Sequence, residues 1–376
     1  MRELIIKPQI HRYGVFKEFA DGFELDGNDL IFTEKFIYDT FIKGLDLPCK
    51  VLLRDAHGLG EPSDDMIDDI AREAAAYDFK RLIAVGGGSV IDIAKILVLE
   101  DCIPSIRIFS KEIPARREKG LVIIPTTCGT GSEMTNLSIA NIVSKGTKLG
   151  IGDECMYADH AVLIPTLVEG LPHKFFLFSS IDALVHAAES YVSPKANVFT
   201  DMMAIKACDM LLNGFVKMYL EGPEIKKDLA GDFLTASCIA GAAFANAGVG
   251  PVHALAYPLG GNYHVPHGET NYQFFAQVFN LYKNEKPGGK IDEIATLIRG
   301  YLDKAGIEST DENVFEKLEE MLGRLEPLKS LREYGMKEEE IDVFAQSVMD
   351  NQQRLLVNSY VPFTLEHARM IYKNRY

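Results

Sequence analysis

Asp182 and His186 are spaced so that a helix would place both side chains on one face. They stand four residues apart in SSIDALVHAAES, a segment with helical periodicity, and residues at i and i+4 are neighbours on a helix surface. A carboxylate and an imidazole at this spacing can share a divalent cation. Taken singly, each is more often an ordinary structural residue.

Two further imidazoles occur in HALAYPLGGNYHVPHGE, residues 253–269. We predict that His253 lies on a helix that Gly260 and Gly261 break. His267 should then open the next helix, so that ligands from either side of the turn converge with the first pair. One carboxylate and three imidazoles suit Fe(II), Zn(II) or a similar borderline cation better than Mg(II) or Ca(II).

Two glycine-rich segments each follow an apolar, strand-like run. RLIAVGGGSVIDIAK contains Gly87, Gly88 and Ser89, and IPTTCGTGSEMT contains Thr126 and Thr127. Free backbone amides at a helix start favour an anion such as a pyrophosphate, whereas the alternative is a tight turn with a serine cap. The GxGxxG fingerprint is absent. Two such segments at one edge of a sheet nevertheless favour a dinucleotide.

Glu34 follows the strand-like run DLIFT. A carboxylate at the end of a strand can accept hydrogen bonds from a ribose 2'-hydroxyl and repels a 2'-phosphate. This position therefore predicts NAD rather than NADP.

The order of elements predicts two domains. Strand-like runs alternate with helical segments in the first half, and helical periodicity dominates after Pro172. We predict an α/β domain with a mostly parallel sheet over residues 1–172 and an all-helical domain over residues 173–376. Binding sites in such sheets lie at the carboxyl ends of the strands, where both glycine-rich segments begin.

Composition narrows the classes of partner. The 376 residues are 47% hydrophobic, which is enough for two hydrophobic cores. Their formal net charge of -15 disfavours nucleic acid or an anionic membrane as a partner. The start, MRELIIKPQIHRYG, lacks the apolar core of a signal peptide, and we predict no membrane span. Six cysteines without a CxxC pair indicate reduced thiols. From the absence of a signal peptide and a membrane span we expect a cytoplasmic protein, and from the acidic charge we expect partners that are small molecules or copies of itself.

Four segments, in order, resemble the motifs of the iron-containing alcohol dehydrogenase family: GGGSVIDIAK, PTTCGTGSE, SSIDALVHAAESYVSP and HALAYPLGGNYHVPHGE. The resemblance covers essentially the whole chain and implies a dehydroquinate synthase-like architecture, a cleft between the domains and a homodimer. It implies that the metal is held by Asp182, His186, His253 and His267. It also implies that NAD binds through Gly87, Gly88, Ser89, Thr126, Thr127 and Lys148, with a looser match at Glu34.

One position departs from the family pattern. Many members carry a histidine four residues after the third ligand, where this chain has Tyr257. His264, three residues before the last ligand, is present instead. Either side chain could transfer a proton or contact the substrate, and a structural role for Tyr257 is an alternative.

The resemblance implies reversible oxidation of a primary alcohol with NAD. Within the family, segments such as GLGEPSDDMIDDI and LREYGMKEEEI favour 4-hydroxybutyrate and succinate semialdehyde as the substrate pair. The carboxylate of such a substrate requires a cation or several donors, for which the candidates are His264, Tyr263, Asn246 and Arg354.

Three alternatives stay open. The first is a dehydrogenase of uncharged primary alcohols or diols with the same metal site. The second is a non-redox lyase of the dehydroquinate synthase type, which would need more lysines and arginines around a phosphorylated substrate. The third is a metal- or nucleotide-binding regulator without enzymatic activity.

Overall fold

A computed structural model describes residues 3–58, 60–145 and 147–376 of the chain. It divides into two compact units. One is formed by residues 6–171, and the other by residues 172–376 together with the described residues up to Ile5. The first residues thus belong with the helical half, although the sequence pattern assigns them to the α/β half.

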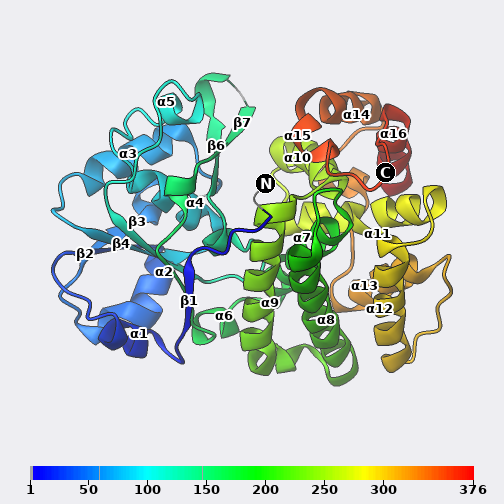
Figure 1. The fold of residues 1–376 in the computed structure, drawn as a ribbon, viewed down its shortest axis with the longest axis horizontal. Helices are drawn as coiled ribbons and strands as arrows, with labels where there is room; N and C mark the ends of the chain where they lie inside the picture. The colour runs from blue at the N-terminus through cyan, green and yellow to red at the C-terminus, as the bar shows by residue number, and fades with distance from the viewer. Residues whose placement is uncertain (1–2, 59, 146) are drawn as a thin grey trace. The chain divides into compact units, whose positions relative to one another are not determined.

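The unit of residues 6–171 is built on a parallel six-stranded sheet with the spatial order β1-β8-β5-β4-β2-β3 (Figure 1). The strands are β1 (Gln9–Arg12), β2 (Asp29–Thr33), β3 (Lys50–Leu53), β4 (Arg81–Gly86), β5 (Gly120–Pro125) and β8 (His160–Leu163). The predicted fold class is confirmed. Strands β2, β4 and β5 match the strand-like runs predicted before Glu34 and before the two glycine-rich segments. Strands β1 and β8 are only four residues long and carry no clear sequence signal.

Alternate residues of the central strands pack into two hydrophobic cores. Leu30 and Phe32 of β2 pack with residues of α3 (Asp64–Ala74) and α4 (Gly88–Leu97), and Ile31 packs with residues of α1 (Phe16–Gly22). Figure 1 shows α3 and α4 on one face of the sheet and α1 on the other. Because both faces are buried, the central strands read as continuous apolar runs.

Smaller elements complete this unit. An antiparallel hairpin of β6 (Leu137–Ile142) and β7 (Thr147–Gly152) follows the second glycine-rich segment. The sequence pattern does not reveal this hairpin. The short helices are α2 (Lys35–Ile37), α5 (Ile106–Phe109) and α6 (Thr166–Glu169).

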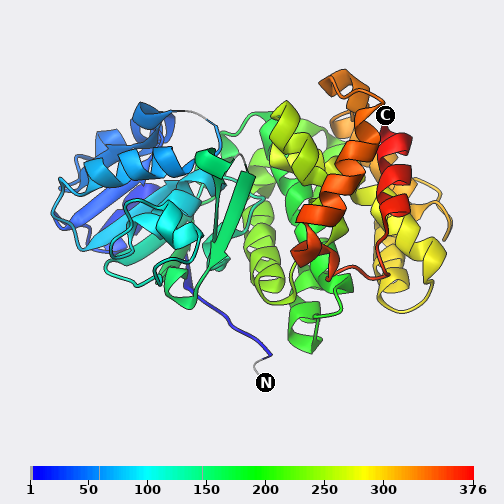
Figure 2. The ribbon, with the colours of Figure 1, turned by 90° about the horizontal axis from the view of Figure 1, so that it is seen from above.

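Within the described residues after Leu171, the regular structure is helical, as predicted. The longer helices are α7 (His173–Val192), α8 (Val198–Glu221), α9 (Lys226–Ala247), α10 (Pro251–Tyr263), α11 (His267–Glu285), α12 (Lys290–Lys304), α13 (Val314–Leu325), α14 (Glu340–Asn351) and α16 (Leu365–Arg375), with the short α15 (Gln353–Leu356). Helices α7, α8 and α9 pack against one another, and α14 and α16 lie side by side, coloured orange and red in Figure 2.

One helix in the described chain, Pro223–Ala247, is long and apolar enough to cross a membrane. Of its most apolar stretch, 61% is buried inside the structure. It packs as a core helix, because its alanines are largely buried and the Phe233 ring contacts Phe176 of α7 and Phe215 of α8.

The expectation that Gly260 and Gly261 break the helix of His253 is wrong. Helix α10 continues through both glycines and ends at Tyr263. His264 then adopts a left-handed conformation with φ 54°. The end is set by Pro266, because a proline disfavours helical geometry at the residue before it and cannot donate to a preceding turn.

This location of Gly261 can be tested by Gly261→Ala. A Cβ added there meets no atom within 4 Å, and alanine stabilises a helix interior by about 0.5–1 kcal/mol relative to glycine. We expect urea denaturation to show a higher free energy of unfolding. Gly335→Ala is the matched comparison. Gly335 has φ +99°, a conformation that strains alanine, so this variant should have a lower free energy of unfolding. A loss at both positions would contradict a helical Gly261.

Candidate functional site

Four side chains of the helical unit converge on one point. Asp182 and His186 come from α7, His253 from α10 and His267 from the first residue of α11, and one ligand atom of each lies within 4.8 Å of all the others. The Oδ1 atom of Asp182 lies 4.0 Å from Nε2 of His253 and 3.9 Å from Nε2 of His267. The first three side chains are buried, and that of His267 is 41% exposed.

The electrostatic environment of Asp182 favours its ionised form. Burial by itself raises the pKa of this carboxyl, but the three imidazoles and a hydrogen bond from Asn271 act in the opposite direction. The net result is a pKa below the ordinary value. The site therefore combines a carboxylate with three nitrogen donors, which is a donor set for a borderline divalent cation.

A close approach of two helices brings His267 to Asp182. A Cβ added at Gly268 would lie 2.3 Å from the backbone oxygen of Phe178. Only glycine allows this contact, because a real Cβ cannot approach a carbonyl oxygen so closely. The start of α11 therefore packs directly on α7.

A buried carboxylate orients His253. Glu189 lies on the same face of α7 and is 1% exposed. Its Oε2 atom is 2.6 Å from Nδ1 of His253, and its Oε1 accepts a hydrogen bond from the backbone nitrogen of Val252 at 2.7 Å. Because a carboxylate only accepts, Nδ1 carries the proton and Nε2 presents a lone pair.

That Nε2 atom of His253 is buried and has no hydrogen-bond partner among the described residues. An imidazole with one nitrogen held by a carboxylate and the other aimed at a cluster of donors is the arrangement of metal-ligating histidines. The residues present thus fit a divalent cation.

Two further neighbours of the cluster escape the sequence prediction. Asn271 donates from Nδ2 to Oδ1 of Asp182 at 2.6 Å and lies 3.2 Å from Nε2 of His267. Phe244 stacks on His186 with ring centroids 4.4 Å apart. Asn271 follows His267 by four residues, so helical spacing could have identified it; Phe244 gives no such signal.

The two glycine-rich segments meet at the carboxyl ends of adjacent strands. Gly86 of β4 pairs with Pro125 of β5. A Cβ added at Gly87 would lie 3.4 Å from Cγ2 of Thr127, and one at Gly88 would lie 3.1 Å from Cγ2 of Thr130. Thr126 is buried beside them and donates its backbone N–H to the Gly86 carbonyl at 3.1 Å.

Helix α4 begins without a side-chain cap. Its N-cap residue is Gly87, which has no side chain to cap the helix, and Ser89 lies within the first turn. The alternative of a serine cap is therefore wrong. A helix start that no cap side chain covers, bounded by glycines, suits an anionic group.

A buried lysine connects these segments. Lys95 of α4 is fully buried and donates to Oγ of Ser132 at 2.8 Å and to Oγ1 of Thr135 at 2.9 Å. Asp92 accepts from the same serine at 3.0 Å. Burial lowers the pKa of Lys95 to about 8, against the opposing effect of Asp92. The second glycine-rich segment is thus tied to the helix that follows the first.

The remaining predicted cofactor residues lie on other elements of the same unit. Glu34 follows β2, the neighbour of β4, and its carboxylate is 3.3 Å from Nη1 of Arg54. Burial raises the pKa of Glu34, although Arg54 acts against this. Lys148 lies on β7, where its ammonium is 2.5 Å from Oε2 of Glu61.

The two predicted proton carriers differ in their surroundings. Tyr257 lies one helical turn after His253, and its ring centroid is 6.3 Å from that of His267. Its hydroxyl accepts a hydrogen bond from Nη2 of Arg354 at 3.1 Å. His264 is exposed at the end of α10.

Two candidates for a substrate carboxylate are engaged elsewhere. Tyr263 donates its hydroxyl hydrogen to Glu340. Asn246 accepts from the backbone nitrogen of Ile5 at 2.8 Å and donates to its carbonyl at 2.9 Å. Asn246 therefore holds the first described residues against the helical unit.

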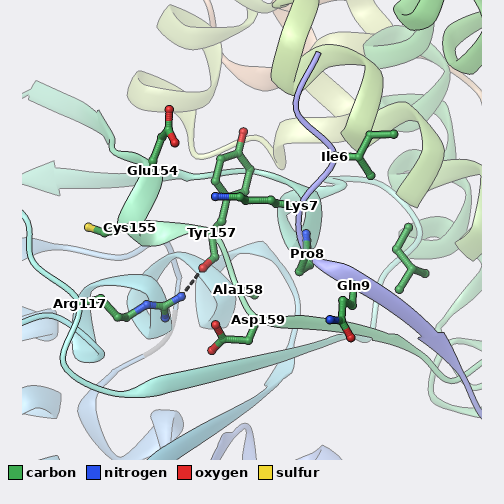
Figure 3. A pocket seen from close by; sticks show the side chains of 11 residues that line it. Ile6, Lys7, Pro8, Gln9, Arg117, Glu154, Cys155, Tyr157, Ala158 and Asp159 are labelled. Atoms are coloured by element: carbon green, nitrogen blue, oxygen red, sulfur yellow. Dashed lines mark hydrogen bonds between the residues drawn. The ribbon is translucent and has the colours of Figure 1, made fainter. Parts of the chain in front are cut away.

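The α/β unit has a cavity of about 700 Å³ that is not lined by the glycine-rich segments. Figure 3 shows Gln9 and Asp159 in its lining and Arg117 directed to the carbonyl of Tyr157. Gln9 starts β1 and Asp159 directly precedes β8, so this cavity is at the amino ends of the strands. The glycine-rich segments are at the carboxyl ends, where parallel sheets bind their ligands.

Comparison with known proteins identifies similar sequences along the chain. The family described as "Iron-containing alcohol dehydrogenase" matches residues 10–165, and the "Fe-containing alcohol dehydrogenase family, C-terminal" matches residues 176–376. The chain is 46% identical to the 4-hydroxybutyrate dehydrogenase of Clostridium kluyveri over 377 aligned positions, covering 100% of both. It is 32% identical to the long-chain-alcohol dehydrogenase 1 of Geobacillus thermodenitrificans, covering 78% of this chain and 74% of the other.

The fold also matches solved structures. One is the sulfoacetaldehyde reductase of Bifidobacterium kashiwanohense in complex with NAD+, with a TM-score of 0.83 and 20% identity over 100% of this chain and 98% of the other. At this identity the likeness concerns the fold.

The role of Glu189 can be measured by metal affinity. Glu189→Gln keeps the size of the side chain but removes the charge that orients His253, and loss of such a partner weakens metal binding about 10- to 100-fold. We expect this loss in competition of Zn(II) between the protein and a chromogenic chelator. Glu320→Gln, on the exposed Glu320 of α13, is the control and should bind Zn(II) like the wild type. Equal affinities in all three proteins would show that Glu189 is only structural.

Proposed function

The chain belongs to the iron-containing alcohol dehydrogenase family, and we propose that it interconverts 4-hydroxybutyrate and succinate semialdehyde. As a member of this family it is an NAD-linked oxidoreductase. The observation that carries the choice of substrate is the 46% identity to a 4-hydroxybutyrate dehydrogenase across the full length of both chains.

The four converging side chains are the proposed metal ligands. Asp182, His186 and His253 would bind from the buried side and His267 from the more exposed side. Fe(II) is expected from the family and Zn(II) from the donor chemistry. When bound, the cation would polarise the oxygen of the substrate and lower the pKa of its hydroxyl, while NAD would accept the hydride.

The protein residues contribute orientation and a dry environment. Glu189 keeps the proton of His253 on Nδ1, so that Nε2 faces the cluster. The buried carboxylate and imidazoles exclude water from the inner side of the site, which strengthens electrostatic interactions with a reacting oxygen.

The α/β unit, residues 6–171, is the proposed NAD-binding domain. Gly87, Gly88 and Ser89 would hold the phosphates at the start of α4, with Thr126 and Thr127 beside them. Glu34 would bind the adenosine ribose, and its negative charge favours NAD over NADP. Lys148 is a further candidate if NAD competes with Glu61 for its ammonium.

Proton transfer is proposed for Tyr257 or His264. The ring contact between Tyr257 and His267 supports Tyr257, whereas His264 is exposed and would act from the solvent side.

We further propose a homodimer in the cytoplasm. Among the described residues the six cysteines form no disulfide, which suits a reducing compartment.

An NADH assay tests the proposed reaction. We expect protein loaded with Fe(II) or Zn(II) to oxidise NADH with succinate semialdehyde, and a chelator to abolish the reaction, because the four ligands then lack their cation. The KM for succinate semialdehyde should be lower than that for butyraldehyde or 3-hydroxypropionaldehyde. Absorbance of the nicotinamide ring measures the rate.

Other outcomes would assign other functions. Equal or better turnover of butyraldehyde would indicate a dehydrogenase of uncharged alcohols. Failure to consume NADH with every aldehyde would contradict the dehydrogenase itself and leave the lyase or the regulator.

A further inference from the structure

An arginine contacts Tyr257, the aromatic neighbour of His267. Arg354, on α15, donates from Nη2 to the hydroxyl of Tyr257 at 3.1 Å, and its guanidinium carbon lies 5.6 Å from the centroid of that ring. The Tyr257 ring in turn lies 6.3 Å from the ring of His267. Two successive ring contacts thus connect the guanidinium to the cluster of Asp182 and the three imidazoles.

The guanidinium of Arg354 is available to an anion. The residue is exposed, and among the described residues its side chain makes no ion pair with a carboxylate. Its contacts to Tyr257 fix the guanidinium against an aromatic ring and a phenol oxygen and use one N–H. The remaining N–H groups form a planar fork that matches a carboxylate.

The spacing suits a substrate that carries an anion at its far end. In an extended four-carbon hydroxy acid, the hydroxyl oxygen and the carboxylate are about 6 Å apart by ordinary bond lengths. The two contacts in succession place the guanidinium carbon no more than about 12 Å from the centre of the His267 ring. A four-carbon hydroxy acid spans this separation once about 2 Å for a metal–oxygen bond and about 4 Å for a carboxylate–guanidinium contact are added to its own length. An uncharged alcohol of the same length, 1-butanol, would place a methyl group where the guanidinium offers hydrogen bonds.

We propose that Arg354 binds the carboxylate of the substrate and that Tyr257 positions Arg354 for this task. The inference rests on the proposed function, because it presupposes an ω-hydroxy acid as the substrate. It gives a role to the tyrosine that stands where many family members carry a histidine. Arg354 is thereby the residue that separates a hydroxy-acid dehydrogenase from a dehydrogenase of simple alcohols.

The helical unit contains a matched control pair. Arg324 of α13 donates from Nη1 to the hydroxyl of Tyr219 at 2.7 Å, and its guanidinium carbon lies 5.6 Å from the centroid of that ring. Arg324 is also exposed. Neither α13 nor α8, which carries Tyr219, supplies any of the four proposed metal ligands.

The test compares KM and kcat for 4-hydroxybutyrate and 1-butanol in the metal-loaded enzyme with NAD. Loss of a charge-assisted hydrogen-bonded pair should raise the KM of Arg354→Ala for 4-hydroxybutyrate about 10- to 100-fold, with less than a threefold change for 1-butanol. Arg354→Lys keeps the charge but loses the fork, so it should recover part of the affinity. Tyr257→Phe should raise the KM for 4-hydroxybutyrate severalfold and leave that for 1-butanol unchanged, whereas a role of Tyr257 in proton transfer would show separately as a lower kcat with both substrates. Arg324→Ala should behave like the wild type.

Two failures are distinguishable. If the wild type does not prefer 4-hydroxybutyrate to 1-butanol, the proposed function fails and this inference fails with it. If the wild type shows that preference, but Arg354→Ala changes the KM of both substrates equally or of neither, the role of Arg354 is overturned while the proposed function stands. Because Arg354 is exposed, thermal melting should show that its variants remain folded, and Arg354→Lys provides a second measurement.

Discussion

The buried carboxylate of Asp182 is the constraint on which the helical unit depends. An isolated carboxylate in a protein interior is costly unless opposite charge or hydrogen-bond donors surround it. Asp182 is 2% exposed, and three imidazoles and the Asn271 amide lie around it. Helices α7, α10 and α11 meet at this point and supply the groups that stabilise the carboxylate. Gly268 makes the meeting possible, because it lets α11 lie directly on α7.

A second buried carboxylate makes the arrangement directional. Glu189 holds the proton of His253 on the side away from Asp182, so that the lone pair of Nε2 faces the cluster. Tyr257 continues the same helix by one turn and leads to Arg354. In our proposal, helix α10 carries the metal ligand His253 and, one turn later, Tyr257, whose partner Arg354 would bind the far end of the substrate.

Much of this organisation could be predicted from residue patterns. Continuous apolar runs identify the central strands because both faces of the sheet are buried, and the spacing of Asp182 and His186 identifies one helix face. The helix through Gly260 and Gly261 could not be predicted in this way. Glycine has a low helix propensity, so the two glycines suggest a break, whereas α10 continues through them and Pro266 determines where it ends. The pairing of Lys95 with Ser132 and of Arg354 with Tyr257 joins residues distant in the sequence, and only the tertiary structure reveals such contacts.

The proposed site holds one cation between Asp182, His186, His253 and His267. The most direct measurement is anomalous X-ray diffraction at the absorption edge of the metal in crystals of the Fe(II)- or Zn(II)-loaded protein. The predicted result is a single peak with one carboxylate oxygen and three imidazole nitrogens as ligands, at about 2.0–2.2 Å. A peak elsewhere, or a ligand set that lacks any of these four side chains, would contradict the account.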